Sequence, residues 1–195
     1  MNDMVMGTRW AKAQSRWGTM IIYSNTNTTG LIRSRNFQRN LMEKGDVLEC
    51  ENIDKYYVGM AGCYGCQVHC HHKYILSKGP YAPIYGEGPE YTSQGAFGTM
   101  PDCPSMETVL VANHLVNMYG LDTLEAGNII AWAMELYEKG IIDDKTTDGV
   151  KLEWGNSEAL FEMIHKIAKR EGFGDILADG MKPAIKKIGK ESEYY

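Results

Sequence analysis

The sequence predicts a mainly α-helical fold, a helical domain whose N-terminal half is rich in loops and carries the cysteines. Three observations support this. Capped amphipathic segments follow residue 104, five of the six prolines lie between residues 77 and 104, and three of the five cysteines lie between residues 63 and 70. A chain of 195 residues suffices for one domain with a substantial core. We therefore expect a single domain over 1–195, loop-rich over 1–104 and helical over 105–195.

Little regular structure is expected at the start of the chain. Trp10 and Trp17 are seven residues apart and would share one face of a helix. The apolar run 20–23 favours a short strand, and the polar cluster 24–27 favours a turn after it. For residues 77–104 we expect a long irregular segment, which is held in place by its own aromatic side chains. Such a segment inside a compact domain is usually functional.

Clear helix signals begin after residue 104. We expect helices over residues 105–119, 122–139, 157–170 and 181–188, with a short turn at 175–178. Gly120 provides a left-handed stop for the first helix. Asp122 and Asn156 are capping residues, and Glu125 completes a capping box with Asp122. Gly172 is expected to end the third helix.

Composition excludes several classes of protein. The hydrophobic share of 44% and a net charge of -5 argue against intrinsic disorder. The 20 basic residues are outnumbered by 25 acidic ones, which argues against nucleic-acid binding. Nothing resembles a signal peptide, and no run of about 18 apolar residues suits a membrane span. We therefore expect a soluble, cytoplasmic protein.

The cysteine spacing indicates a metal centre. Cys63, Cys66 and Cys70 lie in one short segment, and an odd cysteine count without a secretion signal argues against disulfides. Three thiolates with one further ligand suit either a [4Fe–4S] cluster or tetrahedral zinc. Common zinc sites use two separated ligand pairs, so this spacing favours the cluster. Gly62 and Gly65 free backbone amides for cluster sulfurs, which argues against inert buried thiols.

The fourth ligand is left open by the sequence. His71 or His72 would complete a Cys3His site, although adjacent histidines equally suit a solvated or substrate-facing edge. Cys50 and Cys103 are either buried small apolar residues or further ligands.

Six motifs occur in a characteristic order: Arg35-Asn36-Phe37-Gln38, Cys63-x2-Cys66-x3-Cys70, Gly88-Pro89-Glu90-Tyr91 with Phe97-Gly98, Tyr119-Gly120-Leu121-Asp122-Thr123, and residues 133–141 and 170–180. Together they resemble the aldehyde ferredoxin oxidoreductase family, tungsten enzymes with a bis-pterin cofactor. The resemblance extends from about Trp17 to Ala184. Each motif alone is weak, but all six in this order are specific.

The resemblance implies that Cys63, Cys66 and Cys70 are three of four thiolates on a [4Fe–4S] cluster. This cluster would relay electrons between the metal site and ferredoxin. In the family the fourth cysteine lies far downstream, beyond the end of this chain. The metal is expected to be tungsten, with molybdenum as the alternative.

The resemblance also implies a pterin-contacting loop, formed by Asn117, Gly120, Leu121 and Asp122. The family motif usually opens with aspartate, whereas this chain has Asn117. An amide accepts hydrogen bonds at one atom and donates at the other, so the contact with the pterin edge is altered. Asp122 is also a strong helix cap, and capping alone is an equally good explanation of its presence.

Catalysis is the point at which this sequence departs most from the family. The family often reads Gly-Pro-Glu-Tyr-Glu, and its last glutamate lies near the substrate and moves protons. Here that position is Thr92, which cannot act as a carboxylate base. Glu90 remains the candidate catalytic residue, with a structural role towards loop amides as the alternative. The resemblance therefore implies a substrate that is an aldehyde or, because of Thr92, a related oxo or acyl compound; one branch of the family reduces aromatic-ring thioesters of coenzyme A, and membership of that branch is left open by the sequence.

The resemblance places the chain in the middle, helical part of an enzyme several hundred residues long. We expect an oxidoreductase that is inactive as this isolated chain. Its expected partners are the remaining domains or chains of the enzyme, ferredoxin or another electron-transfer protein, and a small-molecule substrate; a homo-oligomer is also compatible. Two alternatives are a cluster-carrying electron-transfer subunit without pterin chemistry and a zinc-stabilised structural module.

Overall fold

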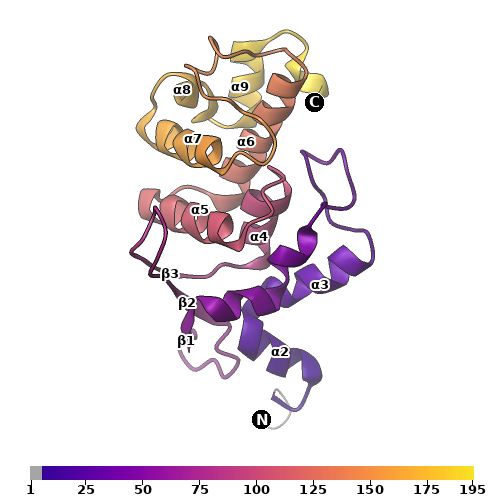
Figure 1. Cartoon of the computed structure of the whole chain (residues 1–195), viewed down its shortest axis with the longest axis vertical. Coiled ribbons are helices and arrows are strands. Elements are labelled where there is room, and N and C mark those ends of the chain that lie inside the picture. Colours follow the sequence, from indigo (N-terminus) through magenta and orange to yellow (C-terminus); the bar gives the residue numbers. More distant parts are fainter. Residues whose placement is uncertain (1–5) are drawn as a thin grey trace.

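The computed structural model describes residues 6–195 and confirms the mainly α-helical fold (Figure 1). Between residues 6 and 104, the structure contains α-helices, a small sheet, short 3₁₀ turns and a π-turn. They include α2 (Arg9–Trp17), α3 (Ile21–Thr28), β1 (Tyr57–Ala61), β2 (His71–Leu76), β3 (Ile84–Glu87), α4 (Tyr91–Gln94) and the π-turn Gly95–Thr99. The C-terminal half contains α5 (Met106–Tyr119), α6 (Thr123–Glu138), α7 (Ser157–Lys169), α8 (Phe173–Leu177) and α9 (Met181–Ile188).

The prediction of a strand at residues 20–23 and a turn at 24–27 was wrong. These residues form a 3₁₀ turn, Gly18–Met20, followed by α3. Ile21 and Tyr23 are buried in the core, and packing of this kind overrides the β-propensity of a short apolar run. The hydroxyl of Thr26 donates to the Ile22 carbonyl at 3.0 Å, so a polar side chain of the expected turn is accommodated within the helix.

Residues 77–104 contain more regular structure than was expected. β3 pairs with β2 in antiparallel register, with Ile75 opposite Tyr85, and the sheet order is β1-β2-β3. The segment then forms α4 and its π-turn, whose residues Phe97 and Gly98 are buried. Aromatic packing does hold the loop portion, because the rings of Tyr81 and Phe161 pack edge to face with their centres 4.9 Å apart.

The helical half agrees closely with the helices expected from the sequence. The side chain of Asn156 accepts from the Ala159 amide at 3.2 Å and caps α7, and Gly120 has the expected left-handed φ of 67°. One detail was wrong. α7 ends at Lys169, where Arg170 takes the left-handed position, and Gly172 instead precedes α8.

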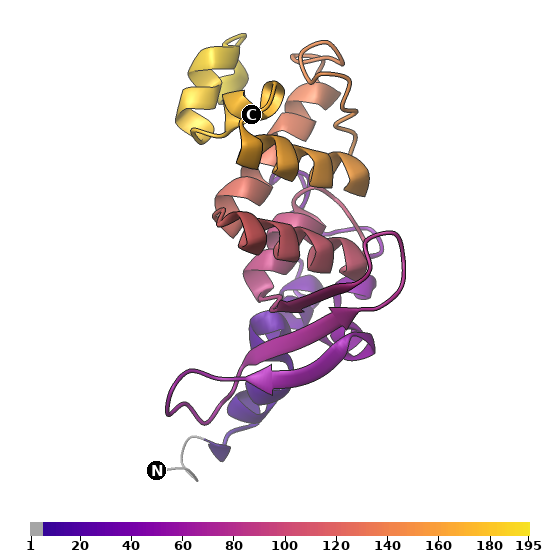
Figure 2. The same ribbon diagram turned by 90° about the vertical axis from the view of Figure 1, so that its left-hand side faces the viewer.

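The core lies between α5, α6 and α7, and Trp132 is fully buried within it. The small sheet lies at the opposite end of the molecule from α8 and α9 (Figure 1), and Figure 2 looks onto its outer face. The buried polar side chain of Asn113 on α5 donates to the Glu87 carbonyl at 2.9 Å and so joins α5 to β3. Across the part of the chain that the structure describes, no helix has the length and apolar character needed to cross a bilayer.

Candidate functional site

The three clustered cysteines lie on the loop that joins β1 to β2. This thiol loop, residues 62–70, is closed at its base by the cross-strand pair Ala61 and His71. It lies at the N-terminal end of the molecule (Figure 2). The Cys66 amide donates to the Cys63 carbonyl at 3.0 Å, and Gly65 takes a left-handed φ of 69°. A hairpin loop of this kind presents all three sulfurs from one short segment.

The donor set fits an iron–sulfur cluster in kind. All five cysteines lie among the described residues and carry free thiols; Cys63 is exposed, and Cys66 and Cys70 are half-buried. Thiolates are the ligands that iron–sulfur clusters prefer, and three of the four required come from this loop. Among residues 6–195, no three Cys, His, Asp or Glu side chains are arranged to hold a single metal ion.

The charge of a second candidate residue, Glu90, acts on Cys70 at the end of the thiol loop. Burial raises the pKa of the Cys70 thiol, and the negative charge of Glu90 raises it further, followed by Cys66 and Cys63. Glu90 therefore lies within electrostatic range of the thiol loop, although it is 20 residues away in the sequence.

Glu90 is held by Thr19, and no amide among residues 6–195 donates to its carboxylate. The Thr19 hydroxyl donates to a carboxylate oxygen of Glu90 and accepts a hydrogen bond from the Tyr91 amide at 2.9 Å. The Gly88 amide donates to the His72 carbonyl at 2.9 Å, which ties the same motif to β2. Glu90 is thus bonded to the residue that follows Gly18, and Gly18 packs against the Cys70 carbonyl at the end of the thiol loop.

The loop expected to contact pterin lies at the junction of α5 and α6. The Leu121 amide donates to the Val116 carbonyl at 2.9 Å, and Asn117 and Gly120 are exposed. The Asp122 side chain accepts from the Glu125 amide at 2.7 Å, which confirms its role as a helix cap.

A pocket of about 220 Å³ joins the Gly-Pro-Glu-Tyr-Thr motif to the start of α6. Tyr91 and Thr92 lie on one side of it, and Leu124 and Asn128 lie on the other. Glu90 is not among its lining residues. Apolar side chains make up most of the remaining wall: Leu31, Ile32, Phe37, Ala96 and Met100. No sequence pattern indicates this pocket, because its walls come from segments that are far apart in the chain.

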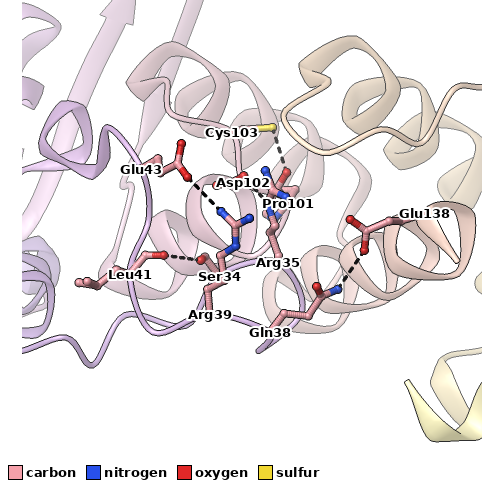
Figure 3. A network of polar contacts seen from close by, with 10 residues as sticks. All are labelled: Ser34, Arg35, Gln38, Arg39, Leu41, Glu43, Pro101, Asp102, Cys103 and Glu138. Carbon is pink, nitrogen blue, oxygen red and sulfur yellow. Dashed lines mark hydrogen bonds and ion pairs between the residues drawn. The ribbon is translucent and has the colours of Figure 1, made fainter.

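The loop that carries Phe37 is fixed by polar contacts (Figure 3). Arg35, Asn36 and Phe37 all have left-handed φ values, between 47° and 66°. Arg35 Nε donates to Asp102 at 2.6 Å, and Asn36 Nδ2 donates to the buried Glu135 at 2.7 Å. These contacts hold residues 35–37 in a backbone conformation that is otherwise unfavourable. As a result, Phe37 lies at the pocket.

The other candidate ligands lie in different surroundings. Cys50 and Cys103 are buried in the hydrophobic core, and burial raises the pKa of each thiol to about 12. His72 is buried, and its Nε2 lies 3.0 Å from the Arg16 carbonyl, so that nitrogen donates its hydrogen there. His71 is half-buried, and it pairs with Ala61 at the base of the thiol loop.

Known proteins resemble the chain over most of its length. The tungsten-containing aldehyde ferredoxin oxidoreductase of Pyrococcus furiosus is 38% identical over 187 residues, which cover 92% of this chain and 29% of that protein. The aliphatic sulfonate oxidoreductase, WOR-like subunit, of the same organism is 35% identical over 161 residues, covering 80% of this chain and 25% of that protein.

A solved structure shares the fold. The active site complex BamBC of benzoyl coenzyme A reductase, in complex with 1,5 dienoyl-CoA, has a TM-score of 0.75 and 26% sequence identity, covering 90% of this chain and 26% of that chain. This chain therefore spans between a quarter and three tenths of the length of these relatives. The family described as aldehyde ferredoxin oxidoreductase, domains 2 & 3, matches residues 1–195. The resemblance inferred from the motifs is confirmed, and the chain belongs to the aldehyde ferredoxin oxidoreductase family.

Proposed function

We propose that the chain is the cluster-bearing part of a cytoplasmic tungsten (or molybdenum) bis-pterin oxidoreductase. Cys63, Cys66 and Cys70 would hold a [4Fe–4S] cluster that relays electrons to ferredoxin. The observation that carries this proposal is the hairpin loop that presents three free thiols from one short segment. The fourth ligand would come from another part of the enzyme, since Cys50 and Cys103 lie in the hydrophobic core.

When bound, the pterin-held metal supplies the two-electron chemistry on the substrate. The loop Asn117, Gly120, Leu121 and Asp122 would contact the pterin edge with exposed polar groups. Asp122 keeps one carboxylate oxygen on the Glu125 amide, which leaves its other oxygen available to a ligand. In this arrangement, capping and cofactor contact are compatible.

The pocket lined by Tyr91, Thr92 and Leu124 would hold the substrate. Its mostly apolar wall suits an aldehyde, or a related oxo or acyl compound, with an apolar body. Thr92 would orient the substrate by a hydrogen bond. Glu90 is the carboxylate of this motif and is our candidate for proton exchange, although it lies on the thiol-loop side of the motif.

Metal analysis tests the proposal directly. The chain is purified anaerobically, alone and together with the rest of its enzyme, and iron, labile sulfide, zinc, tungsten and pterin are measured. We expect iron and sulfide, with tungsten and pterin in the assembled enzyme. Iron and sulfide without pterin would indicate an electron-transfer subunit, and zinc would indicate a structural module.

An activity assay tests whether the isolated chain is inactive. We expect no aldehyde-dependent reduction of a viologen dye by the chain alone, because its pocket is not enclosed and the proposed cluster would take its fourth ligand from another part of the enzyme. Rapid dye reduction by the isolated chain would contradict this.

A further inference from the structure

The 3₁₀ turn between α2 and α3, Gly18–Met20, contacts both the thiol loop and the motif that contains Glu90. No sequence motif points to a role for this turn. Its two contacts are formed by neighbouring residues, Gly18 towards the thiol loop and Thr19 towards the carboxylate.

Gly18 packs against the end of the thiol loop. Its φ is 57°, and a Cβ atom at this position would lie 2.6 Å from the Cys70 carbonyl oxygen. That distance is too short for any other residue, so glycine is what lets the turn approach the loop. His72 reinforces the approach, because its ring bonds the Arg16 carbonyl at the end of α2.

Thr19 fixes the carboxylate in a single orientation. Its hydroxyl has one hydrogen to donate, which goes to Glu90, and it accepts from the Tyr91 amide at 2.9 Å. Glu90 and Tyr91 are adjacent, so the two bonds hold both the side chain and the backbone of the motif. The Gly88–His72 backbone bond of 2.9 Å closes the arrangement on the side of β2.

We infer that Thr19 is a positioning residue that fixes the Glu90 carboxylate beside the Cys70 end of the thiol loop, and so sets the reduction potential of the group that the thiols hold. This inference rests on the proposed function, in which that group is a cluster that gains and loses one electron. A fixed negative charge nearby disfavours the added electron and lowers the midpoint potential. A carboxylate free to turn into solvent has a much smaller effect, because water screens it.

The test compares Thr19→Val with Thr19→Ser and with Thr28→Val in the assembled, cluster-loaded enzyme. Valine keeps the shape of threonine but cannot hold the carboxylate, whereas serine keeps the hydroxyl. Thr28 is a matched control, because it is exposed on α3 and its hydroxyl donates to the carbonyl of Ser24 in the same helix. The midpoint potential of the cluster is measured by redox titration followed by electron paramagnetic resonance.

We expect Thr19→Val to favour cluster reduction by roughly tenfold, a positive shift of about 59 mV for one electron. Thr19→Ser and Thr28→Val keep the original potential. Glu90→Gln gives a shift at least as large, and adding Thr19→Val to it produces no further shift, because the two residues act through one charge. A potential unchanged in Thr19→Val, or additive shifts in the double variant, would overturn the inference.

A second readout is independent of the cluster. In the metal-free chain, Thr19→Val should speed hydrogen exchange at the Tyr91 amide, while Thr28→Val should not. If the wild-type protein holds no cluster, the proposed function fails and this exchange measurement decides alone whether Thr19 positions the motif. Equal exchange at Tyr91 in wild type and Thr19→Val would then overturn the positioning role.

Discussion

Arg35 and Asp102 form an ion pair of 2.6 Å that fastens the loop carrying Phe37 to the turn before α5 (Figure 3). Their side chains are 25% and 12% exposed, so the pair is largely shielded from water. The Arg35 guanidinium also lies 5.9 Å from the ring centre of Trp154. The pair therefore holds one wall of the pocket in place.

Removing this ion pair should destabilise the chain. We expect Asp102→Asn to lower the free energy of unfolding by about 1–3 kcal/mol, because it leaves a largely buried guanidinium without its counter-charge. Urea unfolding of the purified chain measures this. The matched control is Glu43→Gln, which removes the exposed partner of Arg39 and should cost no more than about 0.5 kcal/mol. Equal effects would contradict the role given to Arg35 and Asp102.

Gly18 should be far less tolerant of substitution than another glycine with similar backbone geometry. Gly18→Ala meets the Cys70 carbonyl, whereas a Cβ at Gly189 meets nothing within 4 Å, although its φ of 61° and ψ of -138° are close to the 57° and -152° of Gly18. We expect Gly189→Ala to cost about 1–2 kcal/mol from its backbone conformation alone, and Gly18→Ala to cost roughly 1–3 kcal/mol more. Thermal or urea unfolding of both variants compares them, and similar costs would show that the close approach is unimportant.

Cys103 should make stability depend on pH in alkaline solution. Burial raises its pKa from 9.0 to about 12 in the folded state, so only the unfolded chain loses this proton between those values. The contribution of Cys103 is fully present below pH 9 and is lost as pH rises towards 12.

The measurement is the difference in unfolding free energy between wild type and Cys103→Ala at several pH values. Above pH 9 we expect the advantage of wild type to fall by roughly 1.4 kcal/mol per pH unit. The tyrosines titrate in both proteins and cancel in the difference. Parallel curves for the two proteins would contradict the buried, protonated thiol.

Substitutions of Asp122 separate its capping role from cofactor contact. Asp122→Ala should destabilise the chain by about 1 kcal/mol, and Asp122→Asn should cost little, because asparagine also caps helices well. If the residue also contacts pterin, Asp122→Asn lowers pterin retention in the assembled enzyme while stability is kept. Asn156→Ala, which removes the cap of α7, is the control that loses stability without losing pterin. Full pterin retention in Asp122→Asn would leave capping as the role of this residue.

The sequence predicted those features that depend on neighbouring residues. The caps at Asp122 and Asn156 and the left-handed Gly120 are local signals, and the helices that they delimit are confirmed. α3 was missed because the burial of Tyr23 decides its structure, and burial is set by residues far along the chain.

The candidate site likewise has one part that local sequence predicts and another part that depends on contacts between distant residues. The spacing of Cys63, Cys66 and Cys70 is a local signal, and it alone suffices to predict three thiols on one short segment. The bond between Thr19 and Glu90 joins residues 71 positions apart, so no local pattern could indicate it. The pocket likewise depends on how α4, α6 and the loop of Phe37 pack together.

The most direct test of the central claim is the iron and labile sulfide content of the anaerobically assembled enzyme, measured with the electron paramagnetic resonance spectrum after reduction. We expect about four irons and four sulfides per chain, the number in one [4Fe–4S] cluster. Cys66→Ser should lose both, while Cys103→Ser should keep both. Zinc in place of iron, or full iron content in Cys66→Ser, would contradict the account.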